Sequence, residues 1–580
     1  MRTAGRSGGN GSALDGPSAS VIPDWIRNLL SYTRSVLVAG LCVWGIIESC
    51  YGLSQVLGWR SSRHALYALT GHFQNPGPFG GFIACVMAVA GAWLLYYSLP
   101  SGSIKSIFRT KPQSAVRWVT TALAWVALAA GFLVLPASMS RAGWLGLAIA
   151  LGIEWLRVQP DRQGPGGAFA RVGSGAAERS PIAAPGPLPS GKRTRAIKTI
   201  LVISVGLALV AGAFALKPDS ALGRLHVWRM ECRALAARPW RGAGPGLGPW
   251  AYGEAQEAFF REHLETASPA TVRVAGCPEY AFNEFLGLGV EYGLPALLLS
   301  ILLVVSSILV LHRSNSPLAA GLTAWAVFAC ASYPLSVPQL RILGTIFIIV
   351  AITAGALQTA GRQCRRENRG HPRPRKREGP ADEVSGRDER SEVFGRHCLR
   401  LAGLLPGLST ILLTCWILFC GSIRTGREQF RELYSEGYAL HQAGEYEEST
   451  KLLKEGALLS CDPMFEIIMG KNAEALGDFD RAEELYEKAH YMVPSRLYPL
   501  VRLMRLQVRQ GEDDAALETA RAIVSMPVNE RNAGMVRLRA ETQATLDSLS
   551  AQRCHPAVNH NELTDSDIQN DPRKRLPGSL

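Results

Sequence analysis

The feature that most constrains this chain is a series of apolar stretches, each of about 20 residues and nearly free of charged side chains. Inside a bilayer every backbone N–H and C=O group needs a partner within the protein, so stretches of this kind form membrane-spanning helices. The mean hydropathy of the 580-residue chain is only +0.08, because long polar segments lie between and beyond the apolar ones. The sequence therefore predicts an all-α integral membrane protein that also carries a soluble domain.

The apolar stretches predict a bundle of about nine membrane spans. They lie near residues 35–57, 78–98, 117–136, 142–156, 197–216, 294–312, 317–336, 342–360 and 399–421. No small-residue cleavage site follows the first stretch, and Glu48 interrupts it. We therefore interpret the first stretch as a retained span rather than a cleaved signal peptide.

Basic side chains predict the orientation of the spans. With nine spans, four basic clusters fall on the same side of the membrane, near residues 27–34, 105–111, 192–198 and 365–377. Membrane proteins keep such clusters in the cytoplasm. The N-terminus is then cytoplasmic, whereas the polar segment from Lys217 to Tyr280 and the region beyond about Gly421 lie outside. Because this topology accounts for the net charge of +13, we expect no nucleic-acid partner.

The region after the last span contains an internal repeat. Glycine-led motifs begin at Gly444, Gly477 and Gly511, at a spacing of roughly 34 residues, and each is followed by a helical pattern and then a proline. This resembles the tetratricopeptide repeat, in which paired helices stack into a solenoid. A plain helical bundle with coincidental glycines is the alternative.

These patterns divide the chain into six segments. They are a cytoplasmic tail (1–34), a membrane domain (35–360) whose large outer loop covers 217–282, a basic cytoplasmic loop (361–398), a last span (399–421), a repeat domain (430–546) and a disordered tail (547–580).

The chain lacks the minimal motifs of several enzyme classes. A glycine-rich run from Gly242 to Gly248 neither follows a strand nor precedes the Lys-Ser/Thr pair of a P-loop, and no HExxH or GxSxG occurs. The twelve cysteines are scattered, many inside apolar stretches, without a CxxC pair or a histidine cluster at metal-ligand spacing. We interpret the cysteines as packing residues and expect neither a metal nor a cofactor.

The polar segment between the fifth and sixth spans is the best candidate for a site. It combines arginines, aromatic residues, glycines and carboxylates beside the bilayer, in the motifs Arg224-Leu-His-Val-Trp228, Pro239-Trp-Arg-Gly-Ala-Gly-Pro-Gly246 and Ala281-Phe-Asn-Glu284. Arginine suits phosphate, because its planar fork donates two parallel hydrogen bonds. This mixture of residues therefore favours a charged head group attached to a lipid.

From about Trp44 to Ala360 the chain resembles the O-antigen ligase and polymerase family of bacterial membrane glycosyltransferases. The resemblance rests on Gly71-His-Phe-Gln-Asn-Pro-Gly-Pro-Phe-Gly-Gly81, Ser140-Arg-Ala-Gly-Trp144, Arg224 with Trp228, Pro239 with Gly242 and Gly244, and Asn283-Glu284 with Gly293. It implies transfer of an oligosaccharide from a polyprenyl diphosphate to an acceptor hydroxyl, with inversion, on the outer face of the bacterial inner membrane. The acceptor would be a glycan, a lipid or a protein.

The resemblance also implies roles for single residues. Arg141 and Arg224 match the two arginines that hold the diphosphate in the family, and Trp228, His226 and Arg241 are weaker candidates for substrate binding. The arginines suit the chemistry, because negative charge grows on the lipid diphosphate as it leaves.

The general base departs from the family pattern. The family has a histidine directly before the asparagine, where this chain has Phe282, which cannot accept a proton. We expect Glu284, together with Asn283, to orient or activate the acceptor. His226 and His72 are further candidates, and a reaction without a base is another alternative.

Each candidate also has a structural interpretation. Arg141 could extend towards lipid head groups, and Asn283 with Glu284 could form an N-cap and an acidic first turn. A non-enzymatic envelope scaffold is the alternative function, and a transporter is disfavoured because the spans contain few charges. The repeat domain would recruit the acceptor or a protein partner through its concave surface.

Overall fold

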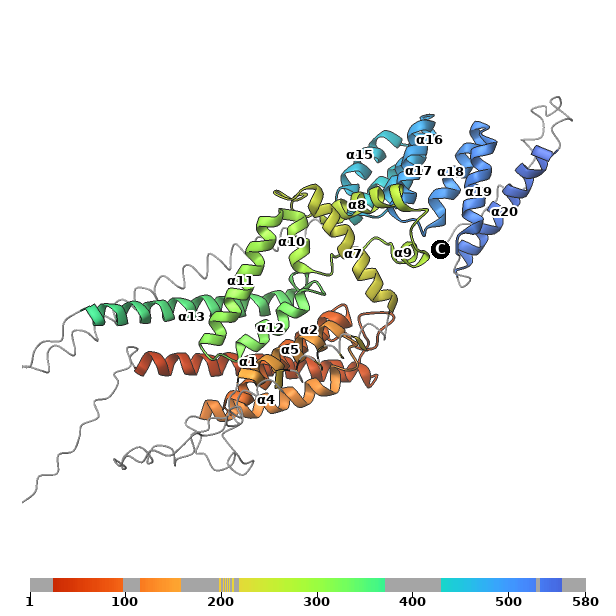
Figure 1. Cartoon of the computed structure of the whole chain (residues 1–580). Coiled ribbons are helices and arrows are strands. Elements are labelled where there is room, and N and C mark those ends of the chain that lie inside the picture. Colours follow the sequence, from red (N-terminus) through yellow and green to blue (C-terminus); the bar gives the residue numbers. More distant parts are fainter. Residues whose placement is uncertain are drawn as a thin grey trace, which may run out of the picture. The chain divides into compact units, whose positions relative to one another are not determined.

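The computed structural model describes residues 24–97, 115–157, 218–370, 429–527 and 532–554, and scattered positions between 198 and 212. The described residues form helices joined by loops, which confirms the predicted all-α class (Figure 1). They belong to two units. The membrane unit comprises residues 1–248 and 280–427, and the repeat unit comprises residues 249–279 and 428–580.

The membrane unit is built from nine described α-helices and one 3₁₀ turn. They are α1 (Asp24–Val56), α2 (Pro76–Tyr97), α4 (Ala115–Val134), α5 (Arg141–Arg157), α7 (Pro218–Ala237), α10 (Glu284–Tyr292), α11 (Leu294–Arg313), α12 (Leu318–Ala329), η1 (Pro334–Ser336) and α13 (Pro338–Gly370). Five helices are long and apolar enough to cross a membrane: α1, α2, α4, α11 and α13. Helix α5 covers the whole predicted span at 142–156 but has only 17 residues, and α12, with 12 residues, covers the first part of the predicted span at 317–336. The predicted span 399–421 lies outside the described residues, and 197–216 lies largely outside them.

Helix α2 forms the centre of the membrane unit, surrounded by α1, α4, α5 and α12 (Figure 1). Its apolar window is 89% buried, whereas that of α11 is only 17% buried, so α11 leaves most of its leucines for lipid. Small residues allow the close contacts of α2, because a Cβ at Gly81 would come within 2.5 Å of the Phe328 ring on α12.

The repeat unit consists of consecutive antiparallel helices. A helix at 429–443 is followed by α15 (Tyr446–Ala457), α16 (Met464–Leu476), α17 (Phe479–Met492), α18 (Leu497–Gln510), α19 (Asp513–Ser525) and α20 (Ala533–Cys554). Gly444, Gly477 and Gly511 have φ values of 86°, 82° and 78° and end the first helix of each pair. Glycine adopts this left-handed conformation without a steric penalty, which explains its recurrence. The predicted helical repeat is thus confirmed.

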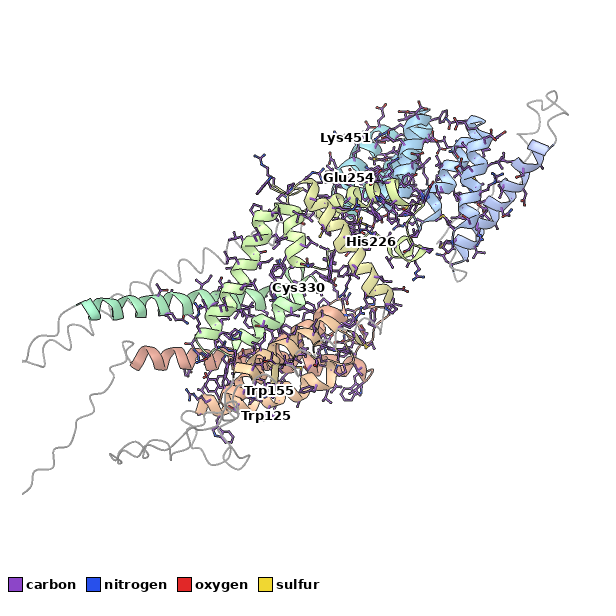
Figure 2. All side chains as sticks on the ribbon, viewed as in Figure 1. Trp125, Trp155, His226, Glu254, Cys330 and Lys451 are labelled. Atoms are coloured by element: carbon purple, nitrogen blue, oxygen red, sulfur yellow. A yellow bond between two sulfur atoms is a disulfide. The ribbon has the colours of Figure 1, made fainter. Side chains whose placement is uncertain are left out.

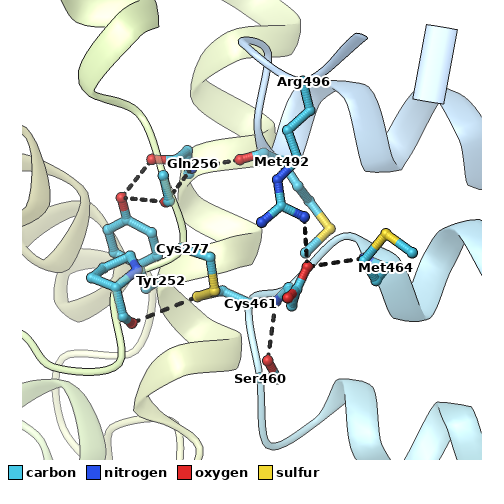
Figure 3. Close-up of a disulfide and its surroundings, with 11 residues drawn as sticks. Tyr252, Gln256, Cys277, Ser460, Cys461, Met464, Met492 and Arg496 are labelled. Atoms are coloured by element: carbon cyan, nitrogen blue, oxygen red, sulfur yellow. Dashed lines mark hydrogen bonds and ion pairs between the residues drawn. A yellow bond between two sulfur atoms is a disulfide. The ribbon is translucent and has the colours of Figure 1, made fainter. Parts of the chain in front are cut away.

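The repeat unit also contains a segment from the large loop of the membrane domain. This segment carries α8 (Gly248–His263) and α9 (Pro269–Val274), and a disulfide joins Cys277 to Cys461, 184 residues later (Figure 3). The interpretation of the cysteines as packing residues is therefore wrong for this pair. Nothing in the local sequence of either cysteine reveals a partner so far along the chain.

Candidate active site

Four loop regions meet at one end of the membrane unit. They are residues 57–75, residues 135–140, the polar segment that contains α7 and α10, and residues 330–337. Hydrogen bonds connect elements at this end, among them Ser140 Oγ to the Gly77 carbonyl at 2.8 Å, Arg141 Nη2 to Ser220 Oγ at 2.9 Å, and Arg224 Nη1 to the Ala331 carbonyl at 3.0 Å. Motifs that lie far apart in the sequence therefore share one region of the fold.

The structure brings Arg141 and Arg224 together. Arg141 is the first residue of α5, and its guanidinium reaches Ser220, one turn before Arg224 on the same helix. Burial lowers the pKa of Arg224, and the positive charge of Arg141 lowers it further. The two guanidinium groups are therefore close enough to repel each other. An anion bound beside Arg224 would offset the cost of its charge.

The partners of Arg224 are neutral. Apart from the Ala331 carbonyl, its guanidinium carbon lies 5.3 Å from the centre of the Phe282 ring, a cation–π contact. Within the described part of the chain, Arg224 forms no ion pair with a carboxylate. A half-buried cation with only neutral partners can accept the charge of a ligand.

Phe282 belongs to an aromatic cluster beside Arg224. Its ring meets Tyr333 edge-on at 5.7 Å, and Tyr280 stacks on Tyr333 at 3.8 Å. The Phe282 carbonyl accepts a hydrogen bond from Trp228 Nε1 at 3.2 Å, so Trp228 joins α7 to the start of α10. Phe282 also has a φ of 51°, a conformation that is uncommon for a bulky residue. The residue in the expected histidine position thus supports Arg224 by packing.

Asn283 and Glu284 have structural partners at the start of α10. The Asn283 side chain is the N-cap and accepts a hydrogen bond from the Leu286 N–H at 3.1 Å. Glu284 Oε1 accepts one from the Leu335 N–H at 2.8 Å and so ties α10 to the turn after α12. The structural interpretation of both residues is realised, while their roles in the reaction stay predictions.

Two weaker candidates lie away from Arg224. His226 is two residues further along α7, about 200° around the helix, and its side chain is buried (Figure 2). Arg241 is exposed in the loop after α7. Trp228 therefore lies near Arg224, whereas His226 and Arg241 do not point towards it.

The candidates chosen from the sequence do not include Glu231 and Glu291, two carboxylates that influence each other. Glu231 is buried on α7, and burial together with the nearby Glu291 raises its pKa to about 8. Glu231 Oε2 has no hydrogen-bond partner among the described residues. The spacing of Arg224, Trp228 and Glu231 at i, i+4 and i+7 is the signal that places all three on one face of α7.

The glycine-rich run is a packing feature of the same region. Glu291 Oε2 accepts a hydrogen bond from the Gly246 N–H at 3.3 Å. A Cβ at Gly242 would lie 2.4 Å from the backbone of Glu291, and Gly242 has a φ of 66°. Only glycine allows the loop to approach α10 this closely.

Comparison with known proteins identifies the membrane region. Residues 126–301 match the family model described as O-Antigen ligase. This chain carries an O-antigen ligase domain. The matched range contains Arg141, Arg224, Asn283 and Glu284. It begins within α4 and ends within α11, two of the long apolar helices. The match supports a membrane enzyme of the O-antigen ligase or polymerase type, and the described apolar helices indicate a multi-pass membrane protein.

Other comparisons add little. No curated protein matches the chain. Three solved structures each align with 22% of this chain. PcrH in complex with the chaperone binding region of PopD is 18% identical, with 94% of that chain covered and a TM-score of 0.20. The Yersinia enterocolitica type III secretion chaperone SycD with a peptide of the translocator YopD is 19% identical (95% covered, TM-score 0.21), and a T3SS complex from Aeromonas hydrophila is 18% identical (85% covered, TM-score 0.21). At these scores the likeness carries no argument about this protein.

Proposed function

We propose that the O-antigen ligase domain transfers an oligosaccharide from a polyprenyl diphosphate to an acceptor hydroxyl. The observation that supports this most is the pair of arginines, Arg141 and Arg224. Burial and the nearby charge of Arg141 disfavour the charge of Arg224, whose contacts are a carbonyl and an aromatic ring. A diphosphate bound between the two guanidinium groups would relieve that repulsion with bidentate hydrogen bonds.

The reaction needs stabilisation of a leaving group. The acceptor oxygen attacks the anomeric carbon, the bond from that carbon to the phosphate oxygen breaks, and the lipid diphosphate leaves with the electron pair. Negative charge therefore grows next to the arginines, where fixed donors are most effective. A single displacement inverts the anomeric carbon. Neither a nucleotide nor ATP is consumed, since the lipid diphosphate is already an activated donor.

We propose that Asn283 and Glu284 orient the acceptor beside this diphosphate. Both stand at the start of α10, directly after Phe282, whose ring contacts Arg224. Trp228 would complete the site through its hydrogen bond to Phe282. His226 and Arg241 remain weaker candidates because of their places on α7 and in the following loop.

We infer that the site and the repeat unit face the periplasm of a bacterium, with the N-terminus in the cytoplasm. The disulfide between Cys277 and Cys461 supports this, because such bonds persist in oxidising compartments. Mass spectrometry of the protein isolated without reductant is expected to find these two cysteines linked. Recovery of two free thiols would contradict the orientation.

The repeat unit would recruit the acceptor or a protein partner. Ligation to a lipid-linked core, polymerisation of repeat units and glycosylation of protein are the three outcomes for this domain. A soluble helical repeat favours a protein acceptor or a partner protein, because stacked helices offer an extended surface for peptides.

The test uses the full-length protein in lipid nanodiscs with a polyprenyl diphosphate oligosaccharide. Arg224→Ala is compared with Arg229→Ala, an exposed arginine on the same helix. We expect donor consumption by the wild type and by Arg229→Ala, and its loss in Arg224→Ala. Equal turnover in all three proteins would remove the arginine site, and no turnover by the wild type with any donor would favour the scaffold.

A further inference from the structure

A second polar pair lies in the loop before α2. The imidazole Nδ1 of His72 is 3.1 Å from both carboxylate oxygens of Glu48 on α1, and the His72 backbone N–H donates to Glu48 Oε2 at 3.3 Å. The Glu48 side chain is 6% exposed, whereas that of His72 is 39% exposed. A buried carboxylate therefore holds one edge of an imidazole whose other edge reaches solvent.

The surroundings fix the ring in this orientation. Tyr51, one turn after Glu48 on α1, stacks on the imidazole with centroids 3.8 Å apart. The Arg63 guanidinium donates to the His72 carbonyl at 3.0 Å. Gly71 has a φ of 61°, and a Cβ there would lie 2.4 Å from the Phe79 ring and 3.2 Å from Glu48 Oε2. Glycine at position 71 is thus required for His72 to reach Glu48.

This pair lies at the same end of the membrane unit as the arginines. Ser140, the residue before Arg141, donates to the carbonyl of Gly77 in the first turn of α2. Gly77 is only five positions after His72, and such a segment spans at most about 18 Å. If the pair takes part in the transfer, the anomeric carbon of a lipid-linked sugar whose diphosphate contacts Arg141 would lie between the two groups.

We propose that His72 is the general base of the transfer and that Glu48 positions it; this rests on the proposed function. Glu48 keeps the proton on Nδ1, which leaves the lone pair on Nε2. As the acceptor oxygen bonds to the anomeric carbon, its proton passes to Nε2 and the lipid diphosphate departs with the electrons of the broken bond. Glu48 stabilises the resulting imidazolium, and the proton then passes to water or to the released diphosphate.

His72 would supply the proton acceptor that Phe282 cannot provide. Phenylalanine cannot accept a proton, and its ring packs on Arg224. Among the described residues, His72 Nε2 forms no hydrogen bond, so it is available for an acceptor. A pair that served only to neutralise Glu48 inside the membrane would not need an exposed ring edge.

The test separates proton transfer from folding and from donor binding. His72→Ala, His72→Gln and Glu48→Gln are compared with His64→Gln, a histidine in the same loop whose Nδ1 accepts from the Leu66 N–H. Transfer to a hydroxyl acceptor is expected to fall by about 10²–10⁴-fold in the His72 variants and by about tenfold or more in Glu48→Gln. The donor affinity of all these variants is expected to equal that of the wild type. The transfer rate of His64→Gln is also expected to equal the wild-type rate.

Azide provides the readout that a structural role would not change, because it attacks without losing a proton. Transfer to azide by His72→Gln is expected to stay within about threefold of wild type. Hydroxyl transfer at the wild-type rate, or equal loss of hydroxyl and azide transfer in both His72 variants, would overturn the proposal. If Arg224→Ala is inactive while the His72 variants are fully active, the assignment of His72 as the base is wrong but the proposed function stands. An inactive wild type would contradict both proposals.

Discussion

Half-buried cations have opposite surroundings in the two units. In the repeat unit, Lys488 Nζ contacts Glu466 Oε1 at 3.0 Å and Glu254 Oε1 at 3.2 Å. Burial alone would lower the pKa of Lys488, but these two carboxylates raise it overall. In the membrane unit, burial and Arg141 lower the pKa of Arg224, and its direct partners are neutral. One cation is neutralised by its own chain and the other is not.

The difference separates a cation that stabilises the fold from one that is available to a ligand. Pairing of Lys488 with α8 and α16 ties the loop segment to the repeats. Arg224 destabilises the fold as long as its charge is uncompensated, which proteins tolerate mainly at functional sites. The comparison predicts that mutations at the two positions have opposite effects on activity and stability.

The largest effect is expected from Arg224→Ala. Removing a donor that stabilises the leaving group should lower turnover by about 10²–10³-fold. The unfolding temperature should stay the same or rise, because a desolvated and repelled charge is lost. The turnover of a lipid-linked donor and the unfolding temperature in detergent are measured for Arg224→Ala and the wild type. A clear loss of stability in the variant would contradict the proposed contrast between Arg224 and Lys488.

Glu231→Gln tests a second uncompensated charge in the membrane unit. Because the pKa of Glu231 is raised from 4.5 to about 8, the folded protein holds this proton more tightly than the unfolded chain. The stability that the proton contributes is complete below about pH 4.5 and is lost as the pH rises through 8. The glutamine variant should escape that loss and be more stable above pH 8 by on the order of 5 kcal/mol.

The measurement is the unfolding temperature of both proteins from pH 5 to 9. A gap that widens with pH supports a buried Glu231 that holds its proton beside Glu291. Parallel curves would show that Glu231 is ionised in the folded protein.

Lys488→Ala is the reciprocal experiment in the repeat unit. It leaves the buried Glu466 without its cation and should destabilise the unit by about 1–3 kcal/mol. Lys451→Ala, an exposed lysine on α15, is the matched control (Figure 2). Chemical denaturation followed by circular dichroism measures the difference, and equal midpoints for the two variants would remove the contrast with Arg224.

Asn283→Ala is expected to have the smallest effect on stability. Loss of the N-cap should cost about 1 kcal/mol, and Asn283→Asp should restore it. If capping is the whole role, the aspartate variant also restores turnover. Low turnover in a stable aspartate variant would instead assign Asn283 to the acceptor.

The parts of the fold that depend on local pattern were predictable. Apolar length marked the helices α1, α2, α4, α11 and α13, and the three glycines marked the turns of the repeat. The association of Arg141 with Arg224 followed from the family motifs. Local pattern alone would not have joined two residues 83 positions apart.

The remaining features are contacts between residues whose neighbours in sequence give no sign of them. Cys277 pairs with Cys461, and residues 249–279 pack with the repeats instead of with the helices that flank them in the chain. Glu48 pairs with His72 across a turn that depends on Gly71. Such pairs form where tertiary packing brings helices together, which periodicity along one helix does not encode.

The most direct test of the account is a double-mutant cycle on diphosphate affinity. Binding of a short-chain prenyl diphosphate is measured for the wild type, Arg141→Ala, Arg224→Ala and the double variant. If the two guanidinium groups share one anion, each single variant loses affinity and the double variant loses less than the sum of the two. Unchanged affinity in either single variant, or strictly additive losses, would contradict a shared diphosphate site.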